Sequence, residues 1–180
     1  MTTAGSRPRV RRQAWALAAV ALVLSALLRL VLGPLAQWPS YHDLADTRTL
    51  GPLARAGDVL TNLAILAAGL WGATLGRRVR ADDYERLALR VLVAATIATA
   101  LGSAWYHAAP SDATLVWDRV PMVVVMASLL ALVLGDRVDT RFAREALLPL
   151  GACGVASVAW WAATGDLTAY AIVRVGTGAA

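Results

Sequence analysis

The chain has 180 residues, of which 58% are hydrophobic and 16% charged, whereas about a quarter of the residues in a soluble domain are charged. This balance excludes an ordinary soluble globule, and the high hydrophobicity excludes a disordered chain. Seventeen basic residues, all of them arginine, and twelve acidic residues give a net charge of +5. The single cysteine, Cys153, excludes an intrachain disulfide and a cysteine-based metal site. We therefore expect a membrane protein.

Five stretches are long and apolar enough to cross a bilayer, which takes about 20 mostly apolar residues. The first has a longer apolar run than a cleaved signal peptide, so we expect it to be retained. A sixth helix is predicted to begin at Leu167, with too few residues to span. Small residues four apart, Gly72 with Gly76 and Ala98 with Gly102, predict close helix packing. The five predicted spans are Gln13–Gly33, Asp58–Gly76, Leu87–His107, Thr114–Gly135 and Ala146–Ala163.

The fold class that follows is all-α: a polytopic transmembrane helix bundle with five complete spans and an incomplete sixth. Residues 1–12 form a basic N-terminal segment, and residues 13–180 form one transmembrane helical domain. Arginines cluster in the N-terminal segment and in the second and fourth connections, whereas the third and fifth connections carry none. The positive-inside rule therefore predicts a cytoplasmic N-terminus, in the bacterial inner membrane. Charge spread over helix flanks in this way excludes a nucleic-acid-binding surface.

Polar side chains gather at the predicted outer ends of three spans. Ser103 and His107 are four residues apart and share one helix face. Asp118 follows the connection AAPSDA, in which Pro-Ser-Asp favours a tight turn, so the third and fourth spans should be antiparallel neighbours. Asp58 and Asn62 have the same four-residue spacing on the second span. Because ionisable groups inside a membrane are costly, we expect these residues to converge on a functional site toward the outside.

Two kinds of chemistry fit these residue types. In metal-assisted hydrolysis an imidazole binds the metal, a carboxylate activates its water and a hydroxyl donates to the oxyanion. A serine–histidine–aspartate nucleophile fits more loosely, because the sequence has no G-x-S-x-G elbow. Structural roles also stay open. They are a hydrogen-bonded Ser103–His107 pair, an interfacial ion pair of Asp118 with Arg119, and a first-turn acid at Asp58.

Four motifs lie in the middle of the chain: YHDLADTR at 41–48, DVLTNL at 58–63, GSAWYH at 102–107 and VWDRVPM at 116–122. In this order and spacing they resemble the alkaline ceramidase family, including its bacterial ceramidase-like members. That family belongs to a wider superfamily of membrane hydrolases that also contains the adiponectin-receptor-like proteins. The resemblance runs from about residue 41 to residue 135, which is over half of the chain.

The resemblance implies a seven-helix core with an intramembrane zinc ion as cofactor. It also implies cleavage of the linear amide of ceramide or a related N-acyl lipid. By motif, Ser103 matches the serine that assists the oxyanion, and Asp118 matches the aspartate that holds or activates the zinc-bound water. His107 matches the first zinc-binding histidine. Calcium, which animal members bind through an acidic N-terminal stretch, is not carried over, because Asp43 and Asp46 cannot be matched position by position.

The sequence departs from the family in its zinc ligands. The family completes its site with a His-x-x-x-His pair on the last helix, whereas this chain has only His42 and His107. A catalytic zinc normally takes three protein ligands and a water. A truncated chain and a degenerate, inactive member both remain open. We expect His42 to be a solvated loop residue, with a role at the site beside Asp43 or Asp46 as the alternative.

Two further functions stay open beside the ceramidase-like hydrolase. One is a non-catalytic lipid-binding or receptor-like membrane protein. The other is a small transporter that uses Asp58, Asn62 and Asp118 as a polar path. In each reading the partner is a membrane lipid or a small solute and not a nucleic acid.

Overall fold

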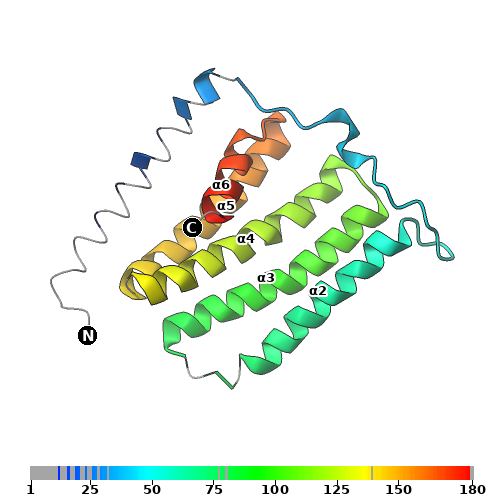
Figure 1. The fold of residues 1–180 in the computed structure, drawn as a ribbon. Coiled ribbons are helices and arrows are strands. Elements are labelled where there is room, and N and C mark those ends of the chain that lie inside the picture. Colours follow the sequence, from blue (N-terminus) through cyan, green and yellow to red (C-terminus); the bar gives the residue numbers. More distant parts are fainter. Residues whose placement is uncertain are drawn as a thin grey trace.

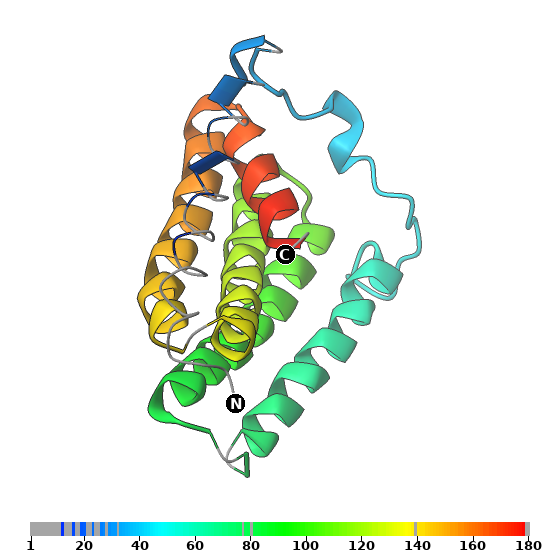
Figure 2. The ribbon, with the colours of Figure 1, turned by 60° about the vertical axis from the view of Figure 1, so that its left-hand side comes forward.

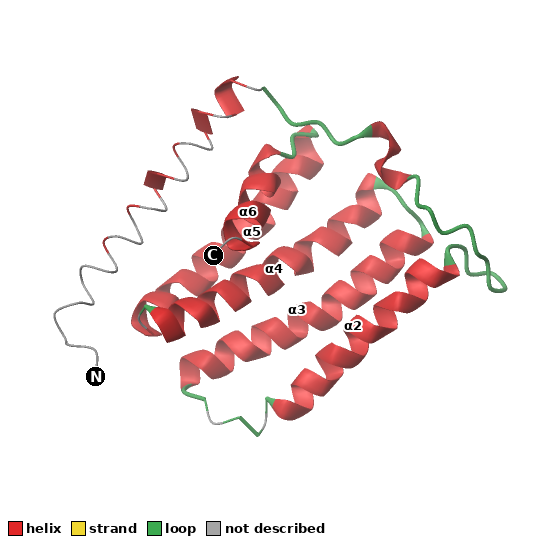
Figure 3. Ribbon diagram, viewed as in Figure 1, coloured by secondary structure: helices red, strands yellow, loops and turns green. Residues whose placement is uncertain are grey.

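The computed structural model describes residues 33–76, 78–79, 81–138 and 140–178, together with isolated positions between residues 12 and 31. The predicted first span, Gln13–Gly33, and the segment 1–12 lie almost wholly outside the described residues. Over the residues it describes, the structure is helical and contains no strand beyond two isolated bridges (Figure 3). The all-α prediction is confirmed for this part of the chain.

From residue 33 onward, the described part of the chain has one short 3-10 helix followed by five α-helices: η1 (Pro39–His42), α2 (Ala56–Leu75), α3 (Asp83–Ala108), α4 (Asp112–Arg137), α5 (Thr140–Thr164) and α6 (Thr168–Gly178). Among the described residues, the segments long and apolar enough to cross a membrane are α2, α3, α4 and residues Arg144–Thr164 of α5. They match the second to fifth predicted spans and indicate an integral membrane protein. Large apolar side chains such as Leu63, Trp71, Leu101 and Leu148 are exposed on the outside of these helices, as lipid contact requires. With 11 residues, α6 is too short to cross.

Capping residues set where α3 and α4 begin. Asp82 accepts a hydrogen bond from the Glu85 amide, and the Glu85 carboxylate accepts one from the Asp82 amide. Ser111 and Thr114 make the equivalent exchange at the start of α4. These capping boxes satisfy amides that the first helical turn leaves free. The second box lies in the predicted Pro-Ser-Asp turn, so three residues separate the end of α3 from the start of α4.

The long helices are joined by short connections, and each packs against the next (Figure 1). In Figure 1, α2, α3 and α4 lie side by side, and Figure 2 shows the short α6 between the ends of α4 and α5. The antiparallel pairing predicted for the third and fourth spans is therefore confirmed. We call the end where α2 begins, α3 ends and α4 begins the polar end of the bundle.

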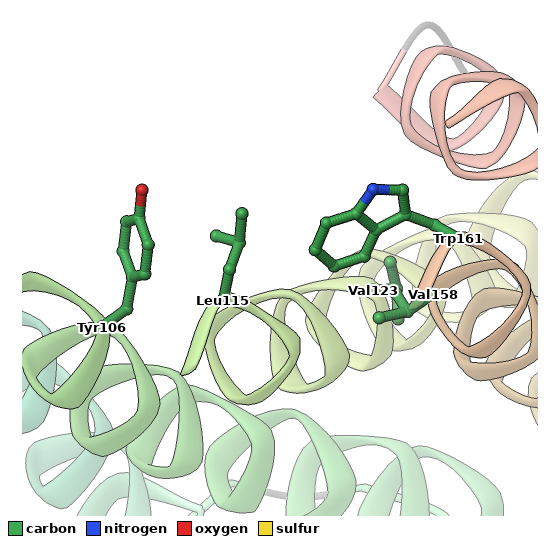
Figure 4. Close-up of a cluster of buried hydrophobic side chains, with 5 residues drawn as sticks. All are labelled: Tyr106, Leu115, Val123, Val158 and Trp161. Atoms are coloured by element: carbon green, nitrogen blue, oxygen red, sulfur yellow. The ribbon is translucent and has the colours of Figure 1, made fainter. Parts of the chain in front are cut away.

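A buried cluster lies just beneath the polar end and joins α3, α4 and α5 (Figure 4). Its members are at most 3% exposed: Tyr106, Leu115, Val123, Val158 and Trp161. Side chains of α6, including Tyr170 and Val173, pack against it. In a bilayer the lipid tails are as apolar as these side chains, so close packing rather than removal from water holds the cluster together and fixes the helix ends that carry the polar residues.

Candidate functional site

Three helices bring four of the five predicted polar side chains together at the polar end. Ser103 is buried one turn before His107 on α3, and Asp118 lies half-buried on α4. Ser103 and Asp118 are neighbours across the contact between α3 and α4, because Gly102 packs against the main chain of Trp117 and Asp118. The His107 Nδ1 atom lies 3.6 Å from Oδ2 of Asp58 in the first turn of α2. The predicted convergence of α2, α3 and α4 residues is therefore observed.

The imidazole of His107 is held beside a carboxylate without a hydrogen bond to it. Its Nδ1 atom is buried and has no hydrogen-bond partner, and 3.6 Å to Asp58 exceeds the usual length of about 2.9 Å. The side chains of His107 and Asp58 are 25% and 34% exposed. An imidazole nitrogen that has no hydrogen-bond partner and lies beside a carboxylate can take or release a proton, or bind a ligand.

The backbone under His107 is fixed by Arg55. The Arg55 guanidinium donates from Nε to the His107 carbonyl at 2.6 Å and from Nη2 to the Ala108 carbonyl at 2.7 Å. These carbonyls belong to the last turn of α3, where no helical amide remains to pair with them. Arg55 is also the N-cap of α2 and has a left-handed φ of 51°. One side chain therefore ties the start of α2 to the end of α3.

Backbone contact brings Ser103 next to Asp118. A Cβ atom on Gly102 would collide with the Trp117 carbonyl oxygen, so α3 and α4 touch through their main chains here. That carbonyl is available because Pro121, four residues on, has no amide hydrogen to donate to it. The glycine predicted to allow close packing does so, and the neighbouring residues of the two helices are the site residues.

A loop carboxylate anchors the start of α2. Asp46 accepts hydrogen bonds from the Arg48 side chain at 2.6 Å and from the Asp58 amide at 3.0 Å. The Arg48 side chain in particular, together with the Asp58 and Arg48 amides, holds the pKa of Asp46 below its usual range. A carboxylate at a helix N-terminus is favoured by the free amides and the dipole there. Asp46 thus supports the turn that carries Asp58.

Arg119 does not form the ion pair with Asp118 that one structural reading predicted. No ion pair within 4.0 Å joins it to a carboxylate in the described part of the chain. Arg119 is only 3% exposed and donates to Gln37 at 2.8 Å. Its guanidinium lies over the rings of Trp161, Tyr170 and Tyr41 at 4.1, 4.7 and 5.2 Å. No sequence pattern predicts this aromatic cage, because its rings come from three distant segments.

His42 is not the solvated loop residue that we expected. It ends η1, its side chain is 28% exposed, and its ring nitrogens bond Tyr106 and Asp112, each at 3.1 Å. The Tyr106 ring lies between the rings of His42 and His107. His42 is therefore fixed at the polar end by its own partners.

The remaining polar residues of α2 have local roles. Asp58 lies in the first turn of α2, which confirms the structural role considered for it, while it also approaches His107. Asn62 is buried and donates its amide to the Asp58 backbone carbonyl at 3.0 Å. The two side chains therefore do not act as one polar pair.

The zinc ion implied by the family resemblance does not fit the described residues. Within them, no group of three His, Cys, Asp or Glu side chains is placed to hold a metal ion. His107 and Asp118 are the family-matched pair, and His42 is bound elsewhere. No family model, curated protein or solved structure matches this chain, so the site's geometry and the motifs carry the functional argument.

Proposed function

We propose that this chain is a ceramidase-like membrane hydrolase that acts on the linear amide of ceramide or a related N-acyl lipid. The observation that carries the proposal is the juxtaposition of Ser103 with Asp118 and of His107 with Asp58 at one end of an apolar bundle. The motif resemblance supports the same reaction. Two carboxylates, an imidazole and a hydroxyl supply the proton transfers and the oxyanion donor that amide hydrolysis needs.

Each residue has a role set by its surroundings. Asp118 accepts a proton from the attacking water, whose oxygen forms a bond to the amide carbon. The Ser103 hydroxyl turns from Asp118 to donate to the carbonyl oxygen as negative charge develops on it. His107, beside Asp58, delivers a proton to the nitrogen as the carbon–nitrogen bond breaks. The products are a free amine and a carboxylic acid, and the proton that Asp118 took from the water then passes to His107, which restores both groups.

An apolar groove beside these residues supports a lipid substrate. The groove, about 610 Å³, lies between α3 and α4 and includes Gly102, Trp105, Trp117 and Val120. Gly102 and Trp117 directly precede Ser103 and Asp118 in sequence, so an acyl chain in the groove would bring its amide next to them. Ligand pockets of this size, mainly apolar with a few polar groups, are typical for small molecules.

The proposed location is the bacterial inner membrane, with the N-terminus in the cytoplasm and the polar end outside. The arginine distribution supports this orientation, because the connections at the opposite end of α2 to α5 are the arginine-rich ones. At the polar end the stacked Trp105 and Trp117 rings, 6.2 Å apart, are exposed. Tryptophan is enriched at membrane–water interfaces.

A non-catalytic lipid-binding or receptor-like protein is the second candidate, because His107 is the only histidine beside Asp118. Purified protein in nanodiscs, incubated with N-acyl lipids of different chain lengths, separates the two. Free amine released by the wild type, and lost in Asp118→Asn and Ser103→Ala, would support the hydrolase. Ser128→Ala is the matched control, since Ser128 is buried on α4 and bonds only Val124.

The assay is run with added zinc and with a chelator, so that any metal requirement appears as a difference between the two. Lipid retained without product would favour the receptor-like protein. Neither binding nor product, with an ion flux that Asp118→Asn abolishes, would favour the transporter and overturn the proposal.

A further inference from the structure

We infer that Arg119 and Arg174 form a binding site for the oxyanion headgroup of a membrane amphiphile, a carboxylate or a phosphate. The site lies between α4, α6 and the segment before η1. It is distinct from the Ser103–His107 pair, and it does not require the hydrolytic activity proposed above.

The first observation is a buried cation with an unused donor. Arg119 is 97% buried, and its Nη1 atom is inaccessible and has no hydrogen-bond partner, while Nη2 donates to Gln37 at 2.8 Å. The aromatic rings around it offset part of the desolvation of the charge. They do not supply the oxygen that the Nη1 hydrogens require, and an unsatisfied buried charged group is costly. A ligand oxygen would complete the set.

The second observation is an open pocket of about 410 Å³ that Arg119 lines. Asp118, Arg119 and Met122 reach it from one face of α4, and Tyr170 and Arg174 reach it from one face of α6. The helical spacing of these positions places each set on one side of its helix. Arg174 is half-buried, and its Nη1 atom has only two long contacts, to the Tyr170 hydroxyl at 3.5 Å and to the Met122 sulfur at 4.0 Å.

The charge of the pocket favours an anion. Two guanidinium groups, those of Arg119 and Arg174, and one carboxylate, that of Asp118, line the pocket. The net charge of these three side chains is therefore one positive charge. Guanidinium groups bind carboxylates and phosphates through paired, charge-assisted hydrogen bonds.

The remaining walls favour an amphiphile over a free ion. They are apolar: Leu35, Met122, Leu167, Ala171 and Val175. An acyl chain leaving the headgroup would lie along α4 and α6. The structure therefore combines an oxyanion donor set with a lipid-compatible wall in a pocket of ligand size.

The test is native mass spectrometry of the full chain in a neutral detergent, titrated with four probes. These are dioctanoyl phosphatidic acid, decanoate, dioctanoyl phosphatidylcholine and inorganic phosphate. We expect phosphatidic acid or decanoate to bind at least about tenfold more tightly than phosphatidylcholine, as charge-assisted hydrogen bonds imply. Comparison of phosphatidic acid with decanoate identifies the headgroup. If free phosphate binds more tightly than both of them, the inference that the ligand is an amphiphile is overturned.

Variants assign the binding to this pocket. Arg119→Gln and Arg174→Gln should each weaken binding of the anionic lipid by about tenfold or more. Arg90→Gln removes an exposed arginine from the opposite end of α3 and should change nothing. If Arg119→Gln does not fold, Arg174→Gln alone decides. Unchanged affinity in Arg174→Gln, or equal loss in Arg90→Gln, would overturn the inference.

Anion binding at the Arg119–Arg174 pocket does not depend on the proposed hydrolysis. Ser103→Ala should abolish turnover if the proposed function is correct, yet it should keep the anion site. Anion binding without turnover in the wild type would leave this inference standing and reject the hydrolase.

Discussion

The Arg55 side chain donates a hydrogen bond from Nε to the backbone carbonyl of His107 at 2.6 Å, and the two residues are 52 positions apart in the sequence. Arg55 caps the start of α2 and His107 lies in the last turn of α3, so the sequence around either residue does not predict this hydrogen bond. The bond sets the position of the residue whose imidazole approaches Asp58. The stability of the polar end should therefore depend on an arginine that has no chemical role of its own.

Replacing Arg55 with methionine keeps the apolar stem and removes both bonds to the end of α3. Hydrogen bonds to charged groups contribute about 1.5–3 kcal/mol each, so we expect the free energy of unfolding to fall by at least about 2 kcal/mol. Unfolding in lipid nanodiscs measures this. Arg86→Met is the matched control, because Arg86 makes one exposed bond, to the Ala81 carbonyl at 2.9 Å, and should cost less than about 0.5 kcal/mol. Equal losses in the two variants would contradict the role assigned to Arg55.

Acid should weaken the loops at the polar end. The pKa of Asp46 is lowered mainly by Arg48, and the pKa of Asp166 is lowered mainly by the Thr168 hydroxyl, with the Thr168 amide and Arg29 adding to it. A carboxyl whose folded pKa is depressed contributes stability above its unfolded pKa, about 4, and loses it as the pH falls below that value. We expect the thermal unfolding midpoint to drop from about pH 5 downward, and to go on dropping until the pH reaches the depressed folded pKa values.

The variants Asp46→Asn and Asp166→Asn separate the two contributions to this pH dependence. Each should unfold at a lower temperature than the wild type at pH 7 and show a shallower decline on acidification. The double variant should be the flattest of the three. A decline as steep in the double variant as in the wild type would place the acid-sensitive groups elsewhere.

Gly102→Ala should separate α3 from α4. Its Cβ atom would collide with the Trp117 carbonyl, a main-chain atom that cannot rotate away. Overpacking of this kind costs about 1–3 kcal/mol, and we expect a loss near 2 kcal/mol together with reduced activity. Gly151→Ala on α5 is the control, because nothing lies within 4 Å of the added atom, and alanine there should be neutral or stabilising. The unfolding free energies of both variants test the prediction. If Gly102→Ala leaves the free energy of unfolding unchanged, α3 and α4 can move apart without loss of stability.

Tyr106→Phe should release the segment around η1. The Tyr106 hydroxyl bonds His42 at 3.1 Å and lies 3.4 Å from the Tyr41 carbonyl, while its ring stays in the buried cluster. Removing the hydroxyl alone should cost about 1 kcal/mol. Hydrogen–deuterium exchange should rise in residues 38–46 and stay unchanged in α5, which serves as the internal control. Faster exchange in both segments would indicate general destabilisation instead.

Apolar length was enough to predict α2 to α5 as membrane-capable helices, because spanning segments must be long and apolar whatever they pack against. The bounds of α2 to α5 lie within a few residues of the predictions, except that α5 begins six residues before Ala146. The Pro-Ser-Asp turn likewise has local causes, and from it follows the proximity of His107 to Asp118. The capping boxes at Asp82 and Ser111 lie upstream of the apolar runs, which explains the early starts of α3 and α4.

What the sequence did not predict depends on contacts between distant segments. Arg119 was considered as the partner of its neighbour Asp118, whereas the structure surrounds it with rings from η1, α5 and α6. His42 was expected in solvent, whereas Tyr106 and Asp112 bind it from two other helices. No periodicity along one helix carries that information. Such side chains are recognised only once the helices are placed in space.

Pro121, Trp117 and Gly102 form an interdependent set. The proline frees a carbonyl four residues upstream, and the glycine of the other helix leaves room for it. A residue with an amide hydrogen at position 121 would donate a helical hydrogen bond to the Trp117 carbonyl. Glycine would then no longer be required at position 102 to make room for that carbonyl. Among relatives of this chain, the residues at positions 102 and 121 should consequently change together. A relative with proline at position 121 and a bulky residue at position 102 should have a different spacing between α3 and α4.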